Sequence, residues 1–99
     1  MALQRYAFIF KAPGMNFITH NGRLESEAFE ATLCGVANID EALLVAQELL
    51  TRHVQLIELC GAFSAEEVEQ VRAALAERIP VGAVHYDGAQ RARLQQLFG

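Results

Sequence analysis

Apolar and polar positions along the chain follow strand-like runs in some places and helix-like spacing in others. The apolar run at residues 6–10 predicts a first strand, which ends where Pro13 and Gly14 impose a turn. Three further strands are predicted over residues 30–35, 55–60 and 81–86. Residues 15–29 mix polar and apolar side chains, so a loop with a short helix or an irregular hairpin is expected there.

Helices are predicted between these strands and after the last one. Residues 38–53 carry apolar side chains three and four positions apart, which is typical of a helix with one buried face. Residues 64–79 predict a second helix, which Pro80 ends because proline cannot continue it. Residues 89–98 predict a short final helix. Its inward-facing side chains are expected to be Leu94, Leu97 and Phe98.

The middle of the chain is an internal repeat. The tripeptide Leu-Cys-Gly at residues 33–35 recurs at residues 59–61, and the same alignment matches Arg52 with Arg78. Each copy also carries a helix cap followed three residues later by glutamate, a pairing that satisfies free amides at a helix start. The pairs are Asn38 with Glu41 and Ser64 with Glu67. Each copy is therefore a strand followed by a capped helix.

Strand–helix–strand units pair their strands in parallel. We therefore predict one α/β domain over residues 1–99, with a small open, mainly parallel four-stranded sheet and two βα repeats. This resembles half of a (β/α) barrel or a truncated flavodoxin-like sheet. In sequential strand order both crossover helices fall on one face. The other face then needs a cover from residues 15–29, the final helix or a second subunit.

Composition narrows the possible partners. Apolar residues make up 53% of the chain and charged residues 20%, so we expect a folded protein that buries apolar surface, partly between subunits of a homo-oligomer. The net charge of -4 without a basic cluster argues against nucleic acid. No apolar run approaches the ~20 residues of a membrane span, and no signal peptide is recognised. Two cysteines then predict reduced thiols and a cytoplasmic protein.

The strand ends are the predicted ligand site. Ligands of parallel α/β sheets bind at the carboxyl ends of the strands, where glycines permit close approach and helix starts favour anions. A small polar or anionic metabolite would suit such a site, although glycine before a capped helix is also ordinary loop chemistry. The candidate ligand-binding residues are Pro13, Gly14, Cys34, Gly35, Gly61, Asp87 and Gly88.

Four residues are candidates for catalysis: Cys60, Glu58, His20 and His85. Cys60 precedes a helix start, which would favour the thiolate of a nucleophile, whereas a buried cysteine is inert. Glu58 interrupts a strand expected to be buried on both faces, so it is either an acid–base group or a structural partner of Lys11, Arg5 or His85. His20 and His85 could transfer protons or simply be solvated.

Neither a metal nor a cofactor is predicted. The chain contains no C-x-x-C, H-x-x-x-H or H-E-x-x-H spacing, and it lacks the glycine-rich patterns that bind dinucleotides and triphosphates. The repeat places Cys34 and Cys60 at equivalent points of strands expected to be adjacent, close enough for a shared ligand or a soft metal but poorly placed for an unstrained disulfide.

Several motifs together span nearly the whole chain: an A-F-I-F-x-x-P-G start, a histidine near position 20, E-L-C-G at residues 58–61 and V-G-x-V-x-x-D-G at residues 81–88. In these motifs the chain resembles a family of small bacterial α/β proteins known only as a domain of unknown function. The resemblance implies the fold and groups these residues, but it implies no reaction.

Three functions therefore remain open. The first is a metabolite-binding protein with its pocket at the strand ends. The second is an enzyme with Cys60 as nucleophile and help from Glu58, His20 or His85. The third is a structural or assembly module.

Overall fold

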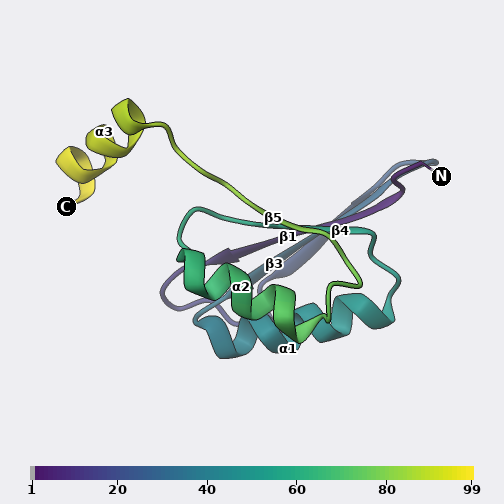
Figure 1. Ribbon diagram of the computed structural model, residues 1–99. Helices are drawn as coiled ribbons and strands as arrows, with labels where there is room; N and C mark the ends of the chain where they lie inside the picture. Colours follow the sequence, from purple (N-terminus) through teal and green to yellow (C-terminus); the bar gives the residue numbers. More distant parts are fainter. Residues whose placement is uncertain (1) are drawn as a thin grey trace.

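A computed structural model describes residues 2–99, which form a five-stranded sheet with helices packed on one side (Figure 1). The strands lie in the order β2-β3-β1-β4-β5. β1 pairs in parallel with β3 and β4, β4 pairs in parallel with β5, and β2 is antiparallel to β3. The elements are β1 Arg5–Lys11, β2 Asn21–Glu25, β3 Glu30–Val36, α1 Ile39–Thr51, β4 Leu56–Leu59, α2 Ala65–Ala74, β5 Val81–Ala83 and α3 Gly88–Phe98.

The mixed α/β class and the mainly parallel sheet confirm the prediction, but the strand count of four was wrong. β2 is the additional strand, and it lies inside the segment for which a loop or irregular hairpin was expected. All five of its residues are exposed, so the strand has no buried alternation that would distinguish it from a loop. Its pairing with β3 comes from tertiary structure.

The core lies between the sheet and the two crossover helices. On β1, Ala7 and Ile9 are fully buried, while Tyr6, Phe8 and Phe10, which alternate with them, are half-buried. Ile57 and Leu59 of β4 are also fully buried, and Ile9 pairs with both Leu59 and Cys34. Alternate residues of each central strand therefore point into one helix-covered layer.

α1 and α2 lie on the same side of the sheet and contact each other (Figure 1). Within residues 2–99 no helix or strand lies against the opposite side, which we call the open sheet face. By the strand register this face carries Tyr6, Phe8, Leu24, Ala31, Leu33 and Glu58. The expectation that β4 is buried on both faces was therefore wrong, because helices cover only one of them.

Both helix caps are present, but only one is complete. In α2 the Ser64 hydroxyl accepts the Glu67 amide at 3.1 Å, and the Glu67 carboxylate accepts the Ser64 amide at 2.9 Å. In α1 the Asn38 side chain accepts the Glu41 amide, but one buried carboxylate oxygen of Glu41 has no hydrogen-bond partner. Only the second copy closes the predicted reciprocal pair.

The repeat holds for the helix starts but not for the strands before them. In β3 the cysteine, Cys34, is buried and Leu33 is exposed, whereas in β4 it is Leu59 that is fully buried. Each strand aims a different residue of the Leu-Cys pair at the helices. β1 also lies between β3 and β4, so the expectation of adjacent strands for Cys34 and Cys60 was wrong.

α3 extends away from the rest of the molecule, beyond β5 (Figure 1). Its predicted position is nearly right, but the prediction that its apolar residues face inward was wrong, because no residue of α3 is buried. Phe98 is the most exposed of these side chains, at 81%. Helical spacing revealed an apolar stripe on α3 without showing what covers it.

Among residues 2–99 no helix has the length and apolar character needed to cross a bilayer.

Candidate functional site

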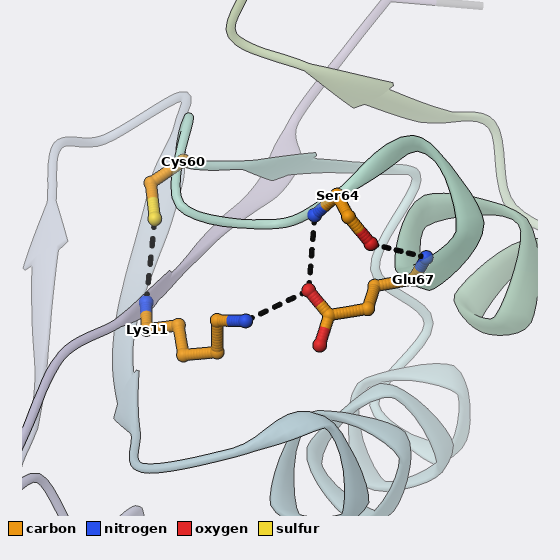
Figure 2. Close-up of polar contacts among 4 residues, drawn as sticks. All are labelled: Lys11, Cys60, Ser64 and Glu67. Carbon is orange, nitrogen blue, oxygen red and sulfur yellow. Dashed lines mark hydrogen bonds and ion pairs between the residues drawn. The ribbon is translucent and has the colours of Figure 1, made fainter. Parts of the chain in front are cut away.

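The carboxyl ends of β1 and β4 bring together Lys11, Cys60, Ser64 and Glu67, as Figure 2 shows. The chain crosses from β3 over β1 to reach β4, so these ends meet where the strand order reverses, a common ligand position in α/β sheets. The Lys11 ammonium donates to the Glu67 carboxylate at 2.7 Å, and the Lys11 amide donates to Cys60 Sγ at 3.3 Å.

The charges at these strand ends are already paired. Lys11 donates to Glu67 and lies 5.2 Å from the centre of the Phe63 ring, and the Lys11 hydrogen bond lowers the pKa of Glu67 below its ordinary value. The same carboxylate completes the α2 cap. An anionic ligand at Lys11 would have to compete with Glu67 for the ammonium group.

The glycines at this edge are approached by side chains of the protein itself. A Cβ at Gly61 would lie 2.6 Å from Cε2 of Tyr86, and one at Gly35 would lie 2.9 Å from Cζ of Phe10. The close approach that these glycines permit is thus used by two aromatic rings. The predicted role of Gly35 and Gly61 in ligand binding stays a prediction. In the structure these two glycines make room for the rings of Phe10 and Tyr86.

The other candidate ligand residues lie in two separate segments, the turn after β1 and the start of α3. Pro13 and Gly14 form the exposed turn after β1, where Gly14 has a φ of 80° that only glycine adopts readily. Asp87 accepts the Gln90 amide as the cap of α3, and Gly88 is the first residue of that helix. Their local roles are those of turn and cap residues.

Glu58 has a partner that the sequence did not indicate. It lies on the open sheet face between Phe8 and Gly82, and the Tyr6 hydroxyl donates a hydrogen bond to it. Burial, then this hydrogen bond and the nearby negative charge, raise the pKa of Tyr6 to about 12. Of the partners expected for Glu58, Lys11 is instead paired with Glu67.

The four catalytic candidates are not assembled into one cavity among those described below. His20 is held in a turn, where its Nδ1 accepts the Asn16 amide at 2.9 Å, and its carbonyl accepts the Gly35 amide. His85 is exposed on the segment after β5. Glu58 lies in β4, and Cys60 directly follows the strand, two residues later. None of the other three candidates forms a hydrogen bond with the Cys60 sulfur, which accepts the Lys11 amide.

The two thiols are expected to react at different rates. Burial raises the pKa of Cys34, while Cys60 is only partly buried, so iodoacetamide at pH 8 should modify Cys34 at least about 10-fold more slowly than Cys60. Mass spectrometry of the C34S and C60S variants would assign each rate. Equal rates would contradict the burial of Cys34, and a Cys60 rate well above that of glutathione would support the enzyme hypothesis.

A cationic cavity lies at the opposite end of the sheet. It has a volume of about 290 Å³ and collects Arg5, Arg23 and Arg52 from β1, β2 and the end of α1. Glu30 and Thr32 of β3 also line it. Arg52 pairs with Glu48 at 3.2 Å and Arg23 with Glu25 at 3.6 Å, both on the surface. Exposed pairs of this kind contribute little stability, so an incoming anion can compete for these arginines.

An apolar cavity adjoins the cationic one. Its volume is about 350 Å³, and Thr32 and Arg52 line both cavities. Cys34 also lines it, which makes this cysteine the one predicted ligand residue that reaches either of the two cavities. Its apolar wall comes from the 15–29 segment and α1: Phe17, Ile18, Leu44, Val45 and Leu49.

Sequence reasoning missed this pair of cavities. The three arginines come from distant positions, and Arg5 was considered only as a partner of Glu58. The sequence held one weaker signal of this site. Thr32 and Cys34 lie two residues apart and therefore on one face of β3, and Arg52 caps the end of the helix that follows this strand. Only the pairing of β2 with β3 brings Arg23 beside Thr32.

Within residues 2–99 no cluster of three or more histidine, cysteine, aspartate or glutamate side chains is placed to hold a metal ion. Comparisons with curated proteins and with solved structures found no match. A family model does match, over residues 4–99, and it confirms the resemblance inferred from the A-F-I-F and E-L-C-G segments. The chain belongs to that family, described as a family of unknown function (DUF6506).

Proposed function

We propose that the protein binds a small organic acid that has an apolar portion, in the two adjoining cavities between β2, β3 and α1. The observation that carries this proposal is the sharing of Thr32 and Arg52 by a cavity with three arginines and a cavity with an apolar wall. A carboxylate would lie among the arginines and the hydrocarbon beside Leu44 and Leu49. Ligand sites commonly combine an apolar lining with a few convergent polar groups.

Charge and size both favour this class of ligand. Three arginines and one carboxylate, that of Glu30, line the cationic cavity. Glu25 and Glu48 pair with Arg23 and Arg52 only through exposed contacts, for which a bound carboxylate can compete. Arginine is well suited to a carboxylate because its planar donors can form two parallel hydrogen bonds. Each cavity is near the ~300 Å³ at the small end of ligand sites, which suits a short-chain or single-ring acid.

Octanoate is a suitable probe, with octanol and octylamine as matched controls of equal chain length. Isothermal titration should show that octanoate binds more tightly than either control. The R52Q substitution should weaken octanoate binding about 10-fold or more, because a charge-assisted hydrogen bond contributes about 1.5–3 kcal/mol.

The R78Q variant provides an internal control. Arg78 matches Arg52 in the repeat but lines neither cavity, so its loss should leave octanoate affinity unchanged. Equal affinity for octanoate and octanol, or equal effects of R52Q and R78Q, would contradict the proposal.

The predictions of a metabolite site at the strand ends, of a Cys60 enzyme and of a cytoplasmic location stay predictions. A small organic acid belongs to the predicted class of ligand, but the two cavities are lined by different residues from those predicted at the strand ends. Cys34 is the residue that the two sites share. A ligand at the strand ends would be revealed by an amide shift at Gly61 rather than at Thr32 in the same titration followed by NMR.

A further inference from the structure

The open sheet face is an apolar surface without a cover. Leu24 and Leu33 on it are 78% and 47% exposed, beside the half-buried rings of Tyr6 and Phe8. A hollow of about 550 Å³ lies over these side chains and has almost entirely apolar walls. Exposed apolar patches of this kind mark interaction sites in soluble proteins.

α3 carries a matching uncovered stripe. Leu94, Leu97 and Phe98 follow the three and four residue spacing of one helix face and are all exposed. An isolated helix of 11 residues is marginally stable in water, so a helix this short ordinarily depends on packing. No residue of α3 is buried against its own chain.

The segment leading to α3 is held in place on its own chain. The Val84 amide donates to the Leu59 carbonyl at 2.9 Å, and the Tyr86 ring lies against Gly61. Arg91 then donates to the Tyr86 carbonyl at 3.1 Å, which ties the first turn of α3 to this segment. Little chain is left between the anchored Tyr86 and the helix to turn α3 back over its own sheet, and α3 points away from it (Figure 1).

We propose that the protein forms a homodimer in which α3 of each copy packs on the open sheet face of the other. The apolar stripe would fill the hollow over Leu33 and Phe8. Arg91 and Arg93 flank the stripe, and Glu58 is the carboxylate on the receiving face, so the charges are complementary. The exchange covers both unpartnered surfaces with one contact and gives the predicted homo-oligomer a defined geometry.

Sedimentation equilibrium of the full chain tests this arrangement. The wild type should be a dimer. The L97E/F98E double variant should weaken the dimer about 100-fold or more, since each side chain loses the burial of a large apolar group. L33E should do the same from the receiving face, while L44E, an exposed leucine on α1, should leave the dimer intact. L24E, at a more exposed site, replaces L33E if that variant fails to fold.

Mixing the damaged variants gives a sharper test. An equimolar mixture of L33E and L97E/F98E contains heterodimers with one intact helix–face pair, so dimer should partly return. A monomeric wild type would overturn the proposal, because α3 would then be uncovered or packed on its own chain. A wild-type dimer that L33E disrupts but L97E/F98E does not would overturn it in favour of sheet-on-sheet packing.

Discussion

Replacement of Ile9 by alanine should lower the free energy of unfolding by about 4 kcal/mol, near the upper end of the effects measured for large-to-small core changes. Ile9 is fully buried in the central strand, with Cys34 on one side and Leu59 on the other. β1 is hydrogen-bonded on both edges, so its backbone cannot easily move to fill the space left by the missing atoms.

Urea denaturation followed by circular dichroism would measure this loss. Mutant and wild type must be compared at one protein concentration, because dimerisation makes apparent stability depend on concentration. The matched control is L44A, which removes an exposed leucine from α1, outside the proposed dimer contact, and should change the stability by less than about 0.5 kcal/mol. A loss of under about 1 kcal/mol for I9A would mean that β1 is not the centre of the core.

Gly61→Ala is expected to cost about 1–3 kcal/mol, as other overpacking substitutions do. The new Cβ would lie 2.6 Å from Tyr86 Cε2, so the ring and the segment that carries it must move. In a Tyr86→Ala background the same substitution should be nearly neutral. A double-mutant cycle should therefore give a coupling free energy of at least about 1 kcal/mol.

Gly82→Ala is the control for this cycle. Gly82 is the middle residue of β5, and a Cβ there would meet nothing within 4 Å. It should be neutral or slightly stabilising, because alanine restricts the unfolded chain more than glycine does. If G61A remains costly in the Y86A background, the backbone at residue 61 and not the Tyr86 ring sets the cost.

Element types were predictable because their signals are local. Capped helix starts follow from Asn38 and Ser64, each with a glutamate three residues later, and both caps accept the amide of that glutamate. The helix-covered strand residues could not be assigned from the repeat. Leu33 and Leu59 occupy the same position in it but face opposite sides of the sheet, since the direction of a side chain depends on pleat phase and not on the tripeptide.

The candidate sites illustrate the same limit. The partner of Glu58 is Tyr6, from a strand some fifty positions earlier, and it could be found only once β1 was placed beside β4. The strand order was not readable because β1 enters the sheet between the two repeat copies. For the same reason the arginines of the cationic cavity carry no shared spacing.

The central position of β1 also sets the order in which the sheet can be completed during synthesis. β1 is made first, yet its neighbours are β3, ending at Val36, and β4, ending at Leu59. Both of its hydrogen-bonding edges are therefore unpaired until β3 emerges, and one stays open until β4 does. Its apolar run Y-A-F-I-F is the kind of unpaired strand that promotes aggregation, so the nascent chain is most vulnerable before the second repeat copy is made.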